Sequence, residues 1–192
     1  MKSFPSLPDG YRKIYSVNLQ NDKKIALLVN VLALIIAAIL VVPMVFLVPI
    51  TYLFNFKDDP TGLFVRMGAL LVLTVAYMVL HELVHGVAMK LCGTKKVKYG
   101  FTGMYAFAGS NDYYNKSAYI FIALAPVVLW GIVLAIITPL VPIEWFWVVY
   151  FIQITNLSGA AGDLFVTLKF SRMPNDILVK DSGVGMTVFS RK

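Results

Sequence analysis

Four long apolar runs alternate with shorter polar stretches along this chain of 192 residues. The runs cover residues 25–54, 63–92, 118–142 and 145–169. A helix of about 25 residues is about 37 Å long, which is enough to cross the roughly 30 Å hydrocarbon core of a bilayer. The pattern therefore predicts four transmembrane helices. Pro43 and Pro49 predict a kink or an early end in the first run, and Gly93 is a predicted helix stop after the second.

The segment between the second and third runs has a different period. Apolar and aromatic residues alternate with others from 97 to 107, which predicts one or two strands, or a hairpin at about 97–108. The polar ends, residues 1–24 and 171–192, show weaker signs of the same pattern. Alternation over residues 11–17 suggests a strand, and the apolar stretches on either side of Asp181-Ser182-Gly183 suggest a small hairpin.

Composition supports a membrane protein. Hydrophobic residues make up 59% of the chain and charged residues 14%, whereas a soluble domain of this length is about a quarter charged. We predict an all-α membrane protein of four transmembrane helices, with the 97–108 strand or hairpin on the cytoplasmic side. The expected organisation is a cytosolic segment at 1–24, a membrane domain at 25–170 and a cytosolic tail at 171–192. No apolar core typical of a cleavable signal is seen in the first 24 residues.

The basic residues predict the topology. They concentrate in the N-terminal segment, in the loop between the second and third runs and in the tail. Only Lys57 and Arg66 lie near the loop between the first and second runs. Basic loops face the cytoplasm, so both termini are expected there, in a multi-pass protein of the cell membrane. The net charge of +7 is explained by an anionic lipid surface, and no nucleic-acid partner is expected.

The second run carries the strongest chemical motif, His81-Glu82-Leu83-Val84-His85. These two histidines are the only ones in the chain. On a helix, positions i and i+4 share a face, so both imidazoles can bind one Zn²⁺ ion. Glu82 projects about 100° away from His81, where it can accept a proton from an attacking water as the catalytic base. The competing interpretation is a buried histidine pair hydrogen-bonded to neighbouring helices, although ionisable groups within a membrane are usually functional.

A hydrolytic zinc site needs a third protein ligand, and Asp163 is the candidate. It is the only aspartate inside an apolar run. In the predicted topology, Asp163 and His85 lie about 9 Å and about 10 Å from the cytoplasmic ends of their helices. The alternative is a carboxylate that pairs with Lys169 or reaches the interface. Asn156, two turns before Asp163, is a candidate contact for the substrate carbonyl or the oxyanion, or else an interhelical hydrogen bond.

These residues carry a resemblance to known families. The stretch His81–Gly86, followed two runs later by Asn156–Asp163, resembles the site-2 protease class of intramembrane metalloproteases. The whole chain more closely resembles a family of small bacterial membrane proteins classed as zincin peptidases. The resemblance implies a bacterial membrane protein with one zinc ion held by His81, His85 and Asp163. The prolines that flank the third ligand in site-2 proteases are absent, and Leu164 replaces a glycine.

The sequence thus predicts a zinc metallopeptidase of the His-Glu-x-x-His type, acting in or at the membrane on a protein or peptide. An extended substrate can pair with the free edge of the strand at 97–108. The alternative for this segment is a loop that lies on the membrane surface with its aromatic side chains among the lipid headgroups. The alternative is a catalytically silent zinc-binding scaffold, immunity factor or regulator. Retention of Glu82 favours the enzyme, because a purely structural site needs no base. A proton or metal transporter is disfavoured, since the chain shows no internal repeat.

Overall fold

The computed structural model divides the chain into two compact units. It describes residues 2–18, 21–54, 59–103, 105–183 and 185–191, so Lys57 and Asp58 of the predicted first connection lie outside the described residues. Unit 1 comprises Met1–Val29, Leu80–Pro126 and Gly162–Lys192, and unit 2 comprises Asn30–Val79 and Val127–Ala161. The three residues proposed as metal ligands all belong to unit 1.

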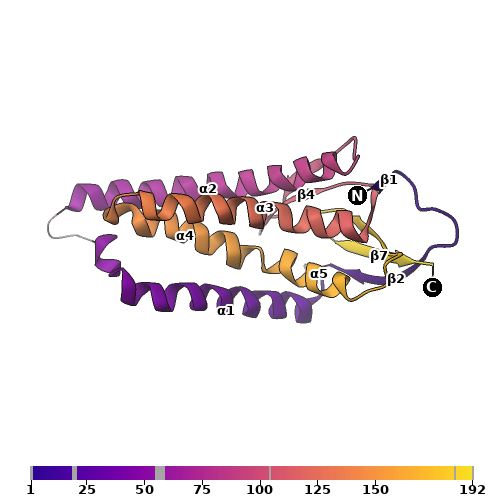
Figure 1. Cartoon of the computed structure of the whole chain (residues 1–192), viewed down its shortest axis with the longest axis horizontal. Helices are drawn as coiled ribbons and strands as arrows, with labels where there is room; N and C mark the ends of the chain where they lie inside the picture. Colours follow the sequence, from indigo (N-terminus) through magenta and orange to yellow (C-terminus); the bar gives the residue numbers. More distant parts are fainter. Residues whose placement is uncertain (1, 19–20, 55–58, 104, 184, 192) are drawn as a thin grey trace. The chain divides into compact units, whose positions relative to one another are not determined.

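Five α-helices make up most of the described residues (Figure 1). They are α1 (Lys23–Leu47), α2 (Pro60–Leu91), α3 (Lys116–Ile137), α4 (Ile143–Gly159) and α5 (Ala161–Ser171), with short 3₁₀ turns at Ile50–Tyr52 and Thr138–Leu140. Local sequence explains their ends. The Asp22 carboxylate accepts the Ile25 N–H at 3.1 Å, and the Asp59 carboxylate accepts the Gly62 N–H at 2.8 Å. These bonds satisfy N–H groups that have no partner within the helix. Gly93, with φ of 104°, follows the end of α2 as predicted.

Three helices in the described residues are long and apolar enough to cross a membrane. They are Lys23–Leu47, Pro60–Leu91 and the helical stretch Lys116–Leu140. The predicted fourth helix at 145–169 is wrong as a single element, because α4 ends at Gly159 and α5 begins at Ala161. Ala160, with φ of −82° and ψ of 15°, interrupts the α-helical conformation between them. The break places Asp163 in the first turn of a new helix.

Unit 1 contains a five-stranded antiparallel sheet that the sequence did not predict as a whole. Its order is β1-β5-β6-β7-β2, and its strands are β1 (Ser3–Phe4), β2 (Arg12–Val17), β5 (Tyr113–Asn115), β6 (Leu178–Asp181) and β7 (Met186–Ser190). The predicted strand at 11–17 and the predicted tail hairpin are confirmed as β2 and as the β6–β7 pair. Figure 1 shows β2 and β7 side by side. The chain is mostly helical, but this sheet makes the all-α description too narrow.

A second, two-stranded sheet confirms the hairpin predicted at about 97–108. It pairs β3 (Lys98–Phe101) with β4 (Ala106–Gly109), and Tyr99 lies opposite Ala108. The glycines of this region allow close packing. A Cβ on Gly109 would clash with the backbone of Ser182 and Gly183, so β4 lies directly against the β6–β7 turn.

The core of unit 1 joins the sheet to the helices that carry the metal-ligand candidates. Its buried residues come from the last turns of α2, the first half of α3, α5 and the inner face of the sheet, and they include Met89, Tyr119, Ile122, Phe170 and Val188. The last turns of α2 and the start of α5 are therefore held by one continuous apolar cluster, which fixes His85 and Asp163 relative to each other.

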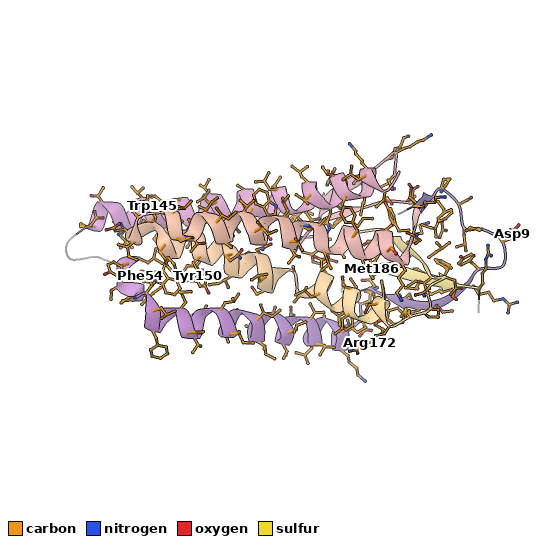
Figure 2. The ribbon with its side chains drawn as sticks, viewed as in Figure 1. Asp9, Phe54, Trp145, Tyr150, Arg172 and Met186 are labelled. Carbon is orange, nitrogen blue, oxygen red and sulfur yellow. The ribbon has the colours of Figure 1, made fainter. Side chains whose placement is uncertain are left out.

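Unit 2 has its own apolar core, built around α4. Trp147 and Leu53 are fully buried, and the Trp147 indole N–H donates to the Pro49 carbonyl at 3.3 Å. Trp145 and Tyr150 belong to the same cluster (Figure 2). The aromatic start of α4 thus packs against the end of α1 and the turn that follows it.

Candidate metal centre

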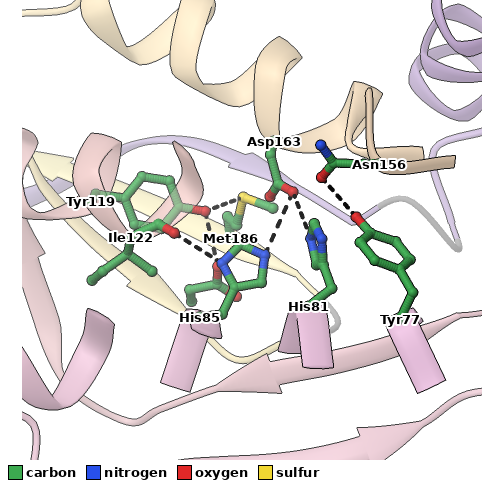
Figure 3. A network of polar contacts seen from close by, with 9 residues as sticks. Tyr77, His81, His85, Tyr119, Ile122, Asn156, Asp163 and Met186 are labelled. Carbon is green, nitrogen blue, oxygen red and sulfur yellow. Dashed lines mark hydrogen bonds and ion pairs between the residues drawn. The ribbon is translucent and has the colours of Figure 1, made fainter. Parts of the chain in front are cut away.

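His81, His85 and Asp163 form a compact cluster in unit 1 (Figure 3). The two histidines lie one turn apart on α2, and their ring centroids are 4.9 Å apart. Each Nε2 atom is 3.5 Å from the same Asp163 Oδ2 atom. The three side chains are 12%, 11% and 24% exposed. The structure thus brings together all three residues that the sequence suggested as metal ligands.

Two of the three distances between the ligand atoms match the spacing in a tetrahedral zinc site. Zinc binds imidazole nitrogen and carboxylate oxygen at about 2.0–2.2 Å, so two ligand atoms on a tetrahedron are about 3.3–3.5 Å apart. The two histidine-to-aspartate distances match this spacing, and all three ligand atoms lie within 4.8 Å of one another. Two imidazoles and one carboxylate are a ligand set typical of catalytic zinc, which keeps its fourth position open for water or substrate.

The hydrogen bond on the far side of the His85 ring determines how the ring faces Asp163. Nδ1 of His85 lies 2.9 Å from the backbone carbonyl oxygen of Ile122. A carbonyl can only accept, so Nδ1 carries a proton and Nε2 is left to face the Asp163 carboxylate. A lone pair on Nε2 would repel that carboxylate oxygen, so the approach requires either a second proton on the ring, which makes an ion pair, or a metal cation between the two atoms.

Glu82 lies beside the cluster and contacts the two-stranded sheet. Its carboxylate accepts a hydrogen bond from the backbone N–H of Ala108 in β4. One turn further along α2, a Cβ on Gly86 would clash with the Tyr99 hydroxyl of β3. The Tyr99 side chain therefore lies directly against Gly86, next to His85. These two contacts place the β3–β4 hairpin against the helical turn that carries Glu82.

Asn156 lies in unit 2 and has partners at both ends of its amide. The Tyr77 hydroxyl donates to its Oδ1 at 2.9 Å, and its Nδ2 donates to the Val127 carbonyl at 3.2 Å. The side chain is fully buried. This is the interhelical hydrogen bond that the sequence left open as the alternative for Asn156, and it joins α2 to α4. A contact between Asn156 and substrate stays a prediction.

A buried polar group around Tyr119 was not predicted from the sequence. The Tyr119 hydroxyl donates to Asp181 Oδ2 at 2.9 Å and lies 2.8 Å from the Met186 sulfur. The other oxygen of Asp181 accepts the Gly183 N–H at 2.8 Å. Burial raises the pKa of the Asp181 carboxyl above its ordinary value, although these hydrogen bonds oppose the rise. An aspartate between two apolar stretches of the tail was the available signal, but its partner is 62 residues away.

The fold and this cluster define a class: a mostly helical chain with apolar helices of membrane-spanning length and a His-His-Asp centre built on a His-Glu-x-x-His helix. Comparison with known families agrees. The model of the DUF3267 family, described as "Putative zincin peptidase", matches residues 74–178, more than half of the chain, and the protein belongs to this family. The resemblance to zincin peptidases drawn from the sequence is thereby confirmed. The matched segment contains His81, Glu82, His85 and Asp163.

A curated protein of Pyrococcus woesei is also similar. It is named "Uncharacterized 24.7 kDa protein in gap 5'region" and is 31% identical over 117 residues, which cover 58% of this chain and 50% of that protein. This chain thus matches about half the length of that relative. No solved structure matches the chain.

Proposed function

We propose that this protein is a zinc-dependent endopeptidase that acts in or at the cell membrane. One observation carries the proposal: the Nε2 atoms of both histidines lie 3.5 Å from the same Asp163 oxygen. Glu82 lies on the same helix, between the two histidines in sequence. Family membership supports a metallopeptidase. His81, His85 and Asp163 would hold the ion. When bound, zinc makes a water more acidic and polarises the carbonyl under attack.

The remaining chemistry belongs to Glu82. A general base must lie within hydrogen-bonding reach of the proton that it removes. Glu82 immediately follows a metal-ligand candidate on α2, so its carboxylate can accept a proton from the attacking water and then deliver it to the leaving amine. The hydrogen bond from the Ala108 N–H orients that carboxylate. The burial of His81 and His85 restricts bulk water around the cluster, which strengthens these interactions.

Metal removal tests the proposal. Purified protein in detergent or vesicles is incubated with a pool of membrane-spanning peptides, and the products are read by mass spectrometry. We expect cleavage by the zinc-loaded protein, no cleavage after chelation, and recovery when zinc is added back. Zinc binding without cleavage of any peptide would favour the silent scaffold or regulator instead. A wild-type protein that binds no zinc would overturn the metallopeptidase proposal.

We further propose that the substrate binds as an extended strand on β4. Within the described residues, β4 pairs only with β3. The Ala108 N–H already donates to Glu82, and in an extended strand the backbone groups of Ala106 face the same edge as those of Ala108. A peptide on this edge would pair with the Ala106 N–H and with the carbonyls of Ala106 and Ala108, which would bring its backbone close to Glu82. The pairing would also keep the peptide out of a helix, whose carbonyls are already hydrogen-bonded.

An N-methyl scan of a cleaved peptide tests strand pairing. Pairing along one edge uses every second N–H of the peptide, so we expect methylation at alternate positions to weaken binding about tenfold each and the intervening positions to be tolerated. Binding is measured on zinc-loaded Glu82→Gln protein, which keeps the peptide intact. An effect without a two-residue period would contradict the pairing. Methylation does not change side chains, so the peptide provides its own control.

A further inference from the structure

The hydrogen bond that orients His85 depends on an unusual feature of α3. In an α-helix the carbonyl of residue i accepts the N–H of residue i+4. Residue 126 is a proline inside α3, and proline has no N–H. The carbonyl of Ile122, four residues earlier, therefore lacks its regular helical donor. This is the carbonyl that lies 2.9 Å from Nδ1 of His85.

The two features complement each other chemically. A buried carbonyl without a donor is unfavourable, and an N–H of a buried imidazole needs an acceptor. Ile122 is 2% exposed and His85 is 9% exposed, so water does not readily serve either group. Their bond satisfies both. It also assigns a proton to Nδ1 and leaves Nε2 directed at Asp163 Oδ2, 3.5 Å away.

We propose that Pro126 is a positioning residue for the metal centre: by removing one N–H from α3, it reserves the Ile122 carbonyl for His85 and thereby holds the Nδ1 proton and the orientation of that ligand. The inference rests on the proposed zinc site but concerns a residue outside the ligand set. Partners that orient a ligating histidine typically change metal affinity about 10–100-fold when lost.

The test is Pro126→Ala, measured by zinc affinity and by the thermal stability of the zinc-free protein. Alanine restores the N–H, which competes with His85 for the Ile122 carbonyl. We expect the zinc dissociation constant to rise about 10–100-fold. Thermal stability of the zinc-free protein should hold or rise, because proline inside a helix is unfavourable. A general packing defect would lower both zinc affinity and stability.

The hydrogen bond from Nδ1 of His85 to the Ile122 carbonyl is measured directly in the zinc-free protein. Nitrogen-15 NMR of labelled histidine should show a slowly exchanging Nδ1–H of His85 in wild type and a faster exchanging one in Pro126→Ala, whether or not Nε2 also carries a proton toward Asp163. His85→Ala provides the assignment. This readout remains decisive if wild type binds no zinc, an outcome that would overturn the proposed function but not the inference. Unchanged exchange of the Nδ1–H and unchanged zinc affinity in Pro126→Ala would overturn the inference alone.

Two controls separate the missing N–H from other effects of proline. Pro43 also lies inside a helix, in the part of α1 that belongs to unit 2. Pro43→Ala should leave zinc affinity and the Nδ1 hydrogen bond of His85 unchanged. In the second control, an alanine-like α-hydroxy acid at position 126 replaces the ring but introduces no N–H. This variant should bind zinc with the same affinity as wild type. A loss of zinc affinity as large as that of Pro126→Ala would contradict the proposed role of the N–H.

Discussion

Glu82→Gln is expected to abolish peptide cleavage while leaving zinc bound. General-base catalysis contributes about 10²–10⁴-fold to such reactions, so the rate should fall by about that factor. Glutamine has nearly the same shape as glutamate, and its amide oxygen can still accept the Ala108 N–H. It cannot accept a proton from water at neutral pH. The measurements are the rate of cleavage of one identified peptide and the zinc content of the purified variant.

The chain offers a matched control for this substitution. Its only other glutamate, Glu144, lies in the first turn of α4 in unit 2. Glu144→Gln makes the same change in charge and shape and should leave both rate and zinc content unchanged. If Glu82→Gln kept full activity, Glu82 could not be the base. If it lost zinc together with activity, its role would be to maintain the site and not to transfer protons.

The histidine half of the site could be predicted because its signal is local. Residues four apart share a helix face whatever the rest of the fold does, so α2 alone brings His81 and His85 together. Asp163 was predictable only through a topology argument, since a different helix supplies it. The break at Ala160 was not predictable, because Gly159, Ala160 and Ala161 include no proline and alanine favours helix.

The sheet was harder to predict because its pairing is long-range. Ser3 of β1 lies opposite Tyr114 of β5, and Tyr114 lies opposite Val179 of β6. Strands of two to four residues are too short to show a clear alternation of apolar and polar positions. The strand at 11–17 could be predicted, but strand pairing could be predicted only for the two hairpins, whose strands are close in sequence. The Ile122 carbonyl was missed for a related reason, since a proline in an apolar helix predicts a kink but does not show which side chain uses the freed carbonyl.

Removal of a metal ligand is expected to have the other large effect. His85→Ala and Asp163→Ala should each bind zinc far more weakly than a variant that only misorients a ligand, which typically loses about 10–100-fold. Purified variants should contain almost no zinc and cleave no peptide. The zinc-dependent rise in melting temperature provides a readout without substrate. A ligand at 100 times its dissociation constant stabilises the folded state by about 2.7 kcal/mol, and both variants should lose that gain.

Two further variants make the expectation for Asp163 specific. Asp176, also in unit 1, accepts hydrogen bonds from the hydroxyl of Ser190, the last residue of β7, and from the backbone N–H of Arg191. Asp176→Ala therefore removes a structural carboxylate and should keep zinc. Asp163→His puts a nitrogen ligand at the same position and should restore part of the binding. If zinc were lost in His85→Ala but kept in Asp163→Ala, the histidines would be ligands and Asp163 would not be. Its oxygen would then serve only as a charged partner of the two imidazoles, and the third ligand would have to be sought elsewhere.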